Sequence, residues 1–202
     1  NRTPTEKSRT GSKVEQVSKE EIQAKSYDMI RDYLNLLPGI SYTANGGIGT
    51  PSNLFIRGLP GGYIKTLFNG IDISDTTNTQ VATHYQHLLT GGVRAIEVLK
   101  GSQGTLYGSS AIAGVVDIAT LGELADGVHH TVQAEGGAFG TARGHYGFAA
   151  ANDGSRIATN IAGIRTDGIS AWAGGSERDG YENLSLDVAG EHRFSEAFSV
   201  FG

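Results

Sequence analysis

The sequence predicts an α+β domain over residues 18–122, followed by antiparallel β-strands over residues 123–202. Glycine supplies 30 of the 202 residues and proline only 4, a ratio typical of a β-rich chain with many turns rather than of a disordered linker. Helix-start signals and a helical spacing of apolar residues occur near the N-terminal end. After about residue 122, apolar residues alternate with small or polar ones, which indicates strands.

The overall composition excludes several classes of function. A net charge of −5 without dense Lys/Arg runs gives no support for nucleic-acid binding. Cysteine is absent, so disulfides and thiolate metal sites are excluded. Residues 1–7 are polar and form no signal peptide, as expected of a processed chain. No apolar run reaches the ~18 residues of a membrane helix, so a membrane location would require a barrel.

Two short helices are expected after a polar, flexible segment at residues 1–17. Ser18 and Glu21 form a capping-box pattern that starts the first helix. Ser26 is expected to cap the second helix, which Pro38-Gly39 stops. The apolar face of that second helix consists of Ile30, Tyr33, Leu34 and Leu37.

Short strands and glycine-containing loops are expected in the rest of this domain. Asn69-Gly70 favours a type I′ turn and predicts a hairpin. A short helix is expected near residues 81–89. Residues 94–118 are expected to form a strand, a loop broken by glycines and a second strand, and they contain no nucleophile–base pair. The other expected strands cover residues 40–43, 53–57, 64–68 and 71–73.

The C-terminal part is expected to contain four strands and the start of a fifth. Leu184, Leu186 and Val188 alternate with small or polar residues, the clearest period of two in the chain. Strands of about ten residues, joined alternately by short turns and longer loops such as residues 166–180, fit an outer-membrane barrel. They also fit a soluble antiparallel sheet, and the alternation alone leaves both open.

Six glycine-containing motifs follow one another between residues 37 and 118. They are Leu37-Pro-Gly39, Ile56-Arg-Gly58, Phe68-Asn-Gly-Ile71, Ile96-Glu-Val-Leu-Lys-Gly101, Leu106-Tyr-Gly108 and Ala111-Ile-Ala-Gly-Val-Val-Asp-Ile118. In this order and spacing they resemble the plug domain of TonB-dependent outer-membrane receptors. Glu135-Gly-Gly-Ala-Phe-Gly-Thr141 and Asp179-Gly-Tyr-Glu-Asn183 resemble the first barrel strands of that family. Asn1-Arg-Thr and Thr43-Ala-Asn-Gly-Gly47 are most similar to the cobalamin receptors.

The resemblance implies a plug that fills the lumen of a large barrel in the bacterial cell outer membrane. It implies import of a scarce metal chelate without any bond being made or broken: cobalamin or a ferric siderophore first, and haem third. The implied partners are the TonB–ExbB–ExbD complex, outer-membrane lipid and the chelate. No nucleic acid and no cofactor are implied, although Ca²⁺ is a candidate ion. The TonB box is expected before Asn1 and is missing from this sequence.

Four strands and the start of a fifth cannot close a barrel, and open edges in lipid are prohibitive, so we expect the chain to be a fragment. The alternative hypothesis is a soluble β-rich ligand-binding or adhesion module. An enzyme is not expected, because the sequence has no convergent nucleophile, base and orienting group.

The apical loops of the plug, at residues 45–52, 59–63 and 74–87, are expected to face the ligand. Their candidate side chains are Asn45, Thr50, Ser52, Tyr63, Asn78, Thr79, Gln80, His84, Tyr85 and His87. The spacing of His84 and His87 allows a shared haem or metal-chelate contact, although a polar helix surface is the expectation we favour.

Arg57 and Lys100 each end an expected strand beside a glycine. The resemblance implies that they pair with carboxylates of the barrel wall and lock the plug in place. These carboxylates are expected in the part of the barrel beyond this chain, and within it Glu135 and Glu191 are only weak candidates.

No metal site is expected, although the acidic residues around the longest loop are weak candidates for binding Ca²⁺ through oxygen atoms. They are Asp167, Asp179 and Glu182. Asn69 and Asp117 depart from the family, which often has Asp and Asn at these two places.

Overall fold

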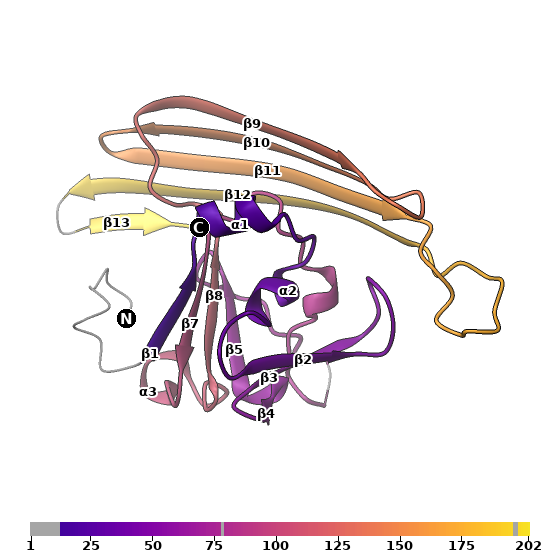
Figure 1. Ribbon diagram of the computed structural model, residues 1–202. Helices are drawn as coiled ribbons and strands as arrows, with labels where there is room; N and C mark the ends of the chain where they lie inside the picture. Colours follow the sequence, from indigo (N-terminus) through magenta and orange to yellow (C-terminus); the bar gives the residue numbers. More distant parts are fainter. Residues whose placement is uncertain (1–12, 78, 196–197) are drawn as a thin grey trace.

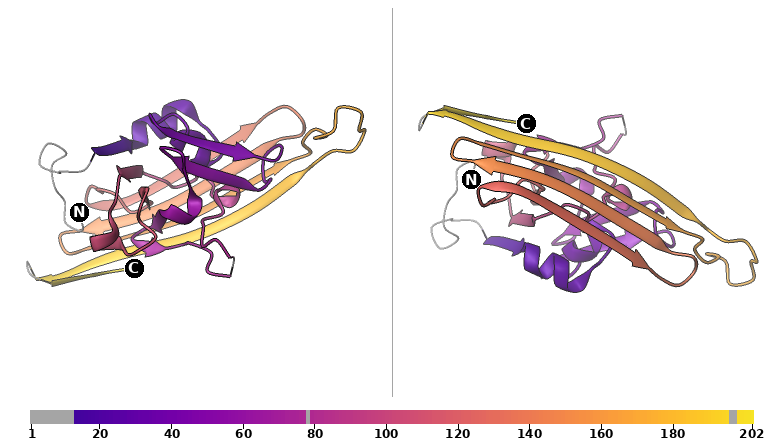
Figure 2. Two further views of the ribbon diagram at one scale, coloured as in Figure 1. Left: turned by 90° about the horizontal axis from the view of Figure 1, so that it is seen from below. Right: turned by 90° about the horizontal axis from the view of Figure 1, so that it is seen from above.

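The computed structural model describes residues 13–77, 79–195 and 198–202. Its N-terminal part, residues 13–122, is called the plug below, and its C-terminal five-stranded sheet is called the wall. The wall arches over one side of the plug, and both views in Figure 2 show its strands crossing that side obliquely (Figures 1 and 2). Among the described residues, no helix has the length and apolar character needed to cross a membrane.

A mixed five-stranded sheet forms the centre of the plug. Its order is β1–β7–β8–β5–β6. Strand β8 pairs antiparallel with β7 and parallel with β5, so it is covered on both edges. The strands are β1 (Lys13–Val17), β5 (Ile64–Phe68), β6 (Ile71–Asp72), β7 (Ala95–Lys100) and β8 (Gly114–Ala119).

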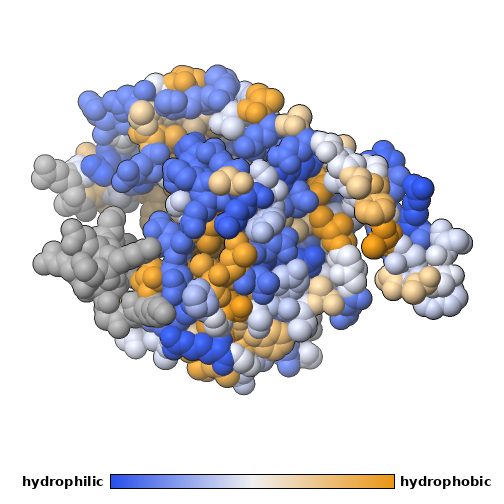
Figure 3. Space-filling view, in the orientation of Figure 1, coloured by the Kyte–Doolittle hydropathy of each residue, from blue (hydrophilic) through white to orange (hydrophobic). Residues whose placement is uncertain are grey.

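The remaining plug elements lie around this sheet. Three short strands, β2 (Ile40–Ala44), β3 (Ser52–Ile56) and β4 (Leu59–Pro60), form a second sheet. The helical elements are α1 (Lys19–Lys25), α2 (Ile30–Leu34), α3 (Gly104–Tyr107) and the 3₁₀ turns η2 (Gly61–Tyr63) and η3 (Tyr85–His87). On the side seen in Figure 3, the surface of the plug shows polar and apolar residues interspersed.

One apolar core joins the two plug sheets to α2. Ile30, Tyr33 and Leu34 are fully buried on α2, as the helical spacing predicts. They belong to one cluster with Ile56 of β3 and Ile96 of β7. Burial of side chains of this size contributes about 1.5–3 kcal/mol each, so this cluster dominates the stability of the plug.

One prediction for the helix ends is confirmed and two are wrong. The capping box of Ser18 and Glu21 is present. Ser26, however, is the C-cap of α1 in a left-handed conformation, and Met29 is the N-cap of α2. The second helix also ends at Leu34 rather than before Pro38. The tertiary core overrides the local cap signal, because the Tyr33 hydroxyl group bonds to the chain on both sides of Ser26.

The expected flexible segment is partly wrong as well. Residues 13–17 form β1, whose Val14 and Val17 lie opposite Leu99 and Ile96 of β7. The strand β1 forms because it pairs with β7, which is about 80 residues away in the sequence. No local pattern reveals such a distant partner. The rest of that segment, residues 1–12, lies outside the described residues. The helix expected near residues 81–89 is only the single turn η3, and the loop within residues 94–118 contains the short helix α3.

The wall is a meander of consecutive antiparallel strands. Its strands are β9 (Gly127–Gly136), β10 (Ala142–Asn152), β11 (Ser155–Thr166), β12 (Tyr181–Ser195) and β13 (Phe198–Phe201). Both edges of the described sheet, β9 and β13, are open, so these strands close no barrel.

The two faces of the wall differ as expected for a barrel. Leu184 and Leu186 point away from the plug and are 79 % and 67 % exposed. On the opposite face, Ala158, Asn160 and Ala162 are buried against the plug. An outer apolar face and an inner face of small and polar residues match a strand with lipid on one side and a filled lumen on the other.

We predict that Gly114→Ala destabilises the plug, because a Cβ atom there would lie 2.4 Å from the Leu99 carbonyl oxygen across the β7–β8 pair. The expected cost is about 1–3 kcal/mol. Hydrogen exchange of the β7 and β8 amides in the full-length protein measures this cost.

Gly104→Ala is the matched control, since a Cβ atom at Gly104 meets nothing within 4 Å and the residue begins α3. Equal protection of β7 and β8 in Gly114→Ala and in the control would contradict the packing described for this strand pair.

Candidate functional site

The surface between the plug and the wall is the first part of the candidate site. A cavity of about 90 Å³ lies between α1, residues 89–94 and strands β9 to β11. Side chains of both signs line it, among them Asp28 from the plug and Arg143 and Glu135 from the wall. Charged and polar groups therefore form part of the contact between the plug and the wall, which is not continuously apolar.

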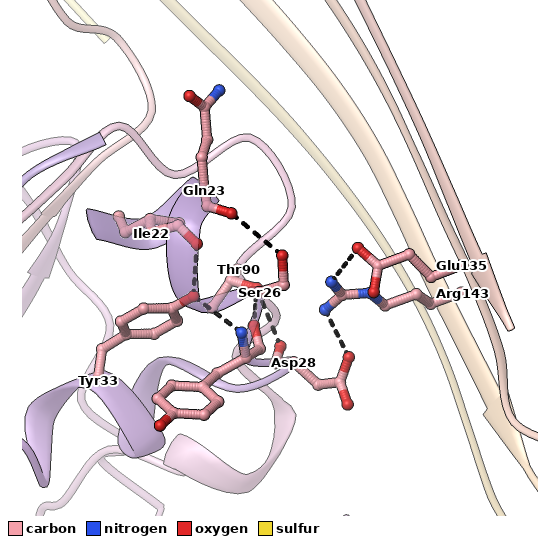
Figure 4. Close-up of polar contacts among 9 residues, drawn as sticks. Ile22, Gln23, Ser26, Asp28, Tyr33, Thr90, Glu135 and Arg143 are labelled. Atoms are coloured by element: carbon pink, nitrogen blue, oxygen red, sulfur yellow. Dashed lines mark hydrogen bonds and ion pairs between the residues drawn. The ribbon is translucent and has the colours of Figure 1, made fainter. Parts of the chain in front are cut away.

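Arg143 makes the strongest polar contact across this surface. Its Nη1 lies 2.6 Å from Oδ1 of Asp28, and its Nη2 lies 2.5 Å from Oε1 of Glu135 (Figure 4). Glu135 lies directly opposite Arg143 on the neighbouring strand β9. One guanidinium group thus holds a carboxylate of the plug and a carboxylate of the wall. We call these three residues the clamp.

Backbone contacts fix the position of Asp28. The Thr90 N–H donates to the Asp28 carbonyl at 3.1 Å, and the Thr90 hydroxyl donates to the Tyr27 carbonyl at 2.6 Å. The Tyr27 N–H donates to the Tyr33 hydroxyl, which in turn donates to the Ile22 carbonyl (Figure 4). Asp28 is therefore presented to the wall by an ordered turn between α1 and α2.

A second polar link lies where the plug ends. The Asn69 side chain bonds to both the N–H and the hydroxyl group of Thr120, at 2.8 and 2.9 Å. The Thr120 hydroxyl and the Asn160 amide each lie 3.0 Å from Oδ2 of Asp187. His145 continues the network, with its Nε2 3.2 Å from the side-chain Oδ1 of Asn160. The Asn-Gly hairpin turn of the plug is thereby connected to β10, β11 and β12.

Two adjacent glycines allow the plug backbone to touch the wall. A Cβ atom at Gly91 would lie 2.4 Å from the Ala162 side chain. Gly92 has a φ of +82°, and a Cβ atom there would lie 2.2 Å from the Asn160 side chain. Only glycine combines this conformation with so close an approach.

The third contact region lies near the long loop of the wall. The Tyr181 ring stacks on His87, with 6.1 Å between the ring centroids, and its hydroxyl donates to the Gln86 carbonyl at 3.2 Å. Asn183 donates to the His87 carbonyl. Gly49, in the 45–52 loop, lies directly against the Tyr181 ring. The wall and two plug loops thus meet around one aromatic side chain.

The structure brings several of the predicted ligand residues to this region. Ser52 bonds to Gln86 of η3, and Thr50 bonds within its own loop. Asn45 is exposed at the start of the same loop. Tyr85 is wrong as a ligand contact, since it is 2 % exposed and its hydroxyl bonds to Thr66 in the core. Burial raises the pKa of this phenol.

A second group of predicted ligand residues lines a separate groove of about 380 Å³. Tyr63, Thr79 and Gln80 meet there, beside Ser109 and Ser110 from the loop after α3. Asn78 lies outside the described residues. The ten predicted residues therefore do not form one site.

The two histidines of the predicted pair have different partners. His87 faces the wall, as described, whereas His84 Nε2 lies 2.9 Å from Oδ2 of Asp75 in its own loop. The two histidine side chains therefore do not point at one common position, as a shared contact would require. Hydrogen bonds from Thr77 and then from His84 lower the pKa of the partly exposed Asp75 carboxyl to about 2.

Arg57 and Lys100 do not contact Glu135 or Glu191, their weak candidate partners within this chain. Lys100 is buried and binds the Pro38 carbonyl and Glu15, both in the plug. Arg57 is exposed, has a φ of 51° and has no ion-pair partner among the described residues. Their candidate partners are bound elsewhere: Glu135 pairs with Arg143, and Glu191 pairs with Arg156.

The weak Ca²⁺ candidates do not assemble either. Asp167 pairs with Arg178 at 2.8 Å, and Asp179 accepts the Ala171 N–H at 2.6 Å. Within residues 13–77, 79–195 and 198–202, no three acidic or histidine side chains, Glu182 included, come together as a metal site would require. These contacts instead order the 166–180 loop.

The family described as TonB-dependent Receptor Plug Domain matches residues 6–115. The chain belongs to this family. The resemblance predicted from the glycine motifs is confirmed, and so are a plug followed by antiparallel strands and a bacterial outer-membrane location. The family consists of receptors and not enzymes, which also agrees with the sequence.

Relatives with assigned functions are similar over the plug. A protein named vitamin B12 transporter BtuB from Vibrio vulnificus is 35 % identical over 104 residues, which are 52 % of this chain and 17 % of the relative. The protein of the same name from Photobacterium profundum is 33 % identical over 124 residues, or 61 % and 20 % of the two chains. The chain thus spans a fifth or less of these relatives.

Solved structures agree in fold over nearly the whole chain. The siderophore receptor PirA from Acinetobacter baumannii has a TM-score of 0.66 and 21 % identity, covering 91 % of this chain and 29 % of that one. The pyoverdine outer-membrane receptor FpvA from Pseudomonas aeruginosa has a TM-score of 0.71 and 15 % identity, covering 95 % and 27 %. The alternative of a soluble binding or adhesion module is not favoured by these findings.

Sequence reasoning missed the residues that join the plug to the wall. Asp28 and Thr120 lie at helix and strand ends without a motif of their own, and the motif that contains Asn69 predicts a turn but not the contact with Thr120. Arg143 and Asp187 carry a usable signal, because the period of two places them on the polar face of their strands. Charged residues on that face, opposite the apolar one, were the positions to examine.

We predict that Thr120→Val weakens the attachment of the plug, because Asp187 then loses the hydroxyl donor and Asn69 an acceptor. The expected cost is about 1–2 kcal/mol. It should raise hydrogen exchange of residues 68–72 and 117–120 in the full-length receptor. Thr159→Val, on the outer face of the wall, is the matched control. An equal effect of both variants would contradict the role of Thr120 in joining the plug to the wall.

We predict that the Asp75 carboxyl titrates with a pKa of about 2. Because this pKa lies below the ordinary one, the Asp75 contacts stabilise the folded state fully above about pH 4. This stabilisation is lost as the pH falls through about 2. Thr77→Val should raise the pKa of Asp75 more than His84→Ala does, because the hydrogen bond from the Thr77 side chain lowers this pKa the most. Carboxyl-resolved NMR titration measures it; an ordinary pKa in the unmodified protein would refute the contact.

Proposed function

We propose that this chain is the plug and the first wall strands of an outer-membrane receptor that imports a metal chelate. The proposal rests chiefly on one observation: a plug of this family lies against the polar inner face of a curved sheet whose outer face is apolar. In a closed barrel, such a plug blocks the lumen. Transport then requires the plug to move, and we propose that TonB, energised by ExbB–ExbD, moves it.

The contacts between plug and wall support a movable plug. They include the partly exposed ion pair of Asp28 and Arg143, a few hydrogen bonds around Thr120 and Tyr181, and one aromatic stack. Partly exposed ion pairs contribute only about 0–1 kcal/mol each. Each contact can break without disturbing the paired backbone of the wall, so the plug can shift while the wall remains intact.

We propose that the ligand binds above the loops that meet at Tyr181 and His87. This region combines an exposed polar loop, an aromatic ring and a histidine, and it lies at the end of the wall that carries the 166–180 loop (Figure 1). Aromatic faces with a few placed polar groups suit a large planar or macrocyclic chelate. Further contacts would come from wall strands beyond this chain.

A corrinoid is our first candidate ligand, because the relatives with about a third of identical residues are named vitamin B12 transporters. A ferric siderophore is second, since the structures with the same fold include siderophore receptors. Haem is third, and the separate partners of His84 and His87 lend it no support.

A binding and uptake comparison tests this proposal. Full-length receptor is titrated with cyanocobalamin, ferric siderophores and haemin in parallel, and cells with and without TonB are tested for growth on each. We expect saturable binding of one class and TonB-dependent growth on it. Tyr181→Ala should weaken that binding, whereas Tyr146→Ala, on the outer face, should leave it unchanged. Uptake that persists without TonB would refute the proposed mechanism.

A further inference from the structure

Arg143 is shared between two carboxylates that belong to different parts of the receptor. Asp28 comes from the turn between α1 and α2 of the plug, and Glu135 comes from β9 of the wall (Figure 4). The two contacts are of equal quality, at 2.6 and 2.5 Å, and use the two terminal nitrogens of one guanidinium group. When the plug shifts, only the Asp28 contact has to break.

The charges of the clamp do not balance. One positive group faces two negative ones, so Asp28 is attracted by Arg143 and repelled by the nearby Glu135. Glu135 also keeps Arg143 paired after Asp28 has left, which removes the cost of an unpaired guanidinium group on the inner wall. Both effects act in the same direction: they reduce the free-energy difference between the docked and the released plug.

We propose that Glu135 is a positioning residue that weakens the hold of Arg143 on Asp28 and so makes the plug releasable. Its role is opposite to that of a structural salt-bridge partner, which would strengthen the contact. The effect on docking of the plug follows from the geometry alone, whereas the effect on uptake rests on the proposed transport function.

The second ion pair of the inner wall provides the contrast. Arg156 binds Glu191 on the neighbouring strand, as Arg143 binds Glu135. Besides Glu191, Arg156 bonds to the Gly122 backbone carbonyl at 3.1 Å. Its plug partner is therefore a neutral carbonyl group and not a carboxylate. Neutralising Glu191 therefore removes the same charge from the same wall without relieving any repulsion on a plug carboxylate.

Three backbone amides around Asp28 can report whether the clamp is closed, because their hydrogen bonds hold the turn that carries Asp28. The Thr90 N–H bonds to the Asp28 carbonyl at 3.1 Å, and the Ile30 N–H bonds to the Leu88 carbonyl at 3.0 Å. The Tyr27 N–H bonds to the Tyr33 hydroxyl at 2.9 Å. Because these bonds surround the docked turn, their hydrogen exchange rises when the turn leaves the wall more often.

The experiment measures hydrogen exchange of these three amides in full-length receptor without ligand or TonB, for Glu135→Gln, Asp28→Asn, the double variant and Glu191→Gln. Glu135→Gln should slow exchange by about two- to fivefold, and Asp28→Asn should speed it by a similar factor. The double variant should behave like Asp28→Asn, because Glu135 has nothing left to repel. Glu191→Gln should leave these amides unchanged.

Faster or unchanged exchange in Glu135→Gln would overturn the proposal, and so would an equal effect of Glu135→Gln with and without Asp28. In cells, Glu135→Gln should lower the uptake rate while leaving the ligand affinity unchanged. If the exchange results hold but the receptor takes up none of the chelates tested, the proposed transport function fails and the inference on docking stands.

Discussion

The alternation of side chains along the wall strands is the constraint on which the rest of the structure depends. Since successive residues of a strand point to opposite faces, Leu184 and Leu186 cannot face outward unless Asp187 faces the plug. The same rule places Arg143 and Asn160 on the inner face. An outer surface suited to lipid therefore fixes, residue by residue, which polar groups are available to hold the plug.

Features that depend only on neighbouring residues in the sequence were predicted correctly. The capping box at Ser18, the Asn69-Gly70 hairpin and the strands of the wall follow from neighbouring residues, and the structure confirms them. Ser26 and the strand β1 could not be predicted this way. Their conformations depend on the Tyr33 hydroxyl and on β7, which are distant in the sequence and close only after folding.

The candidate site was harder to predict than the fold for the same reason. Asp28 and Arg143 are 115 residues apart, and Asn69 and Thr120 are 51 apart. Lys100 shows the limit most clearly: its place in a family motif suggested a partner in the wall, but burial places its ammonium group against Glu15 and a plug carbonyl. Polar groups acquire their partners through packing, and the sequence alone gives only the face on which each lies.

The connection from plug to wall has a consequence for how far the plug can travel. Residues 120–126 join β8 to β9, but Asn69 and Asp187 pin Thr120, and Arg156 holds the Gly122 carbonyl. When these contacts break, the seven residues 120–126 can stretch to about 25 Å at ~3.3–3.6 Å per residue. The end of β8 therefore stays within that distance of the start of β9, so a shift that leaves the wall intact moves this corner of the plug the least.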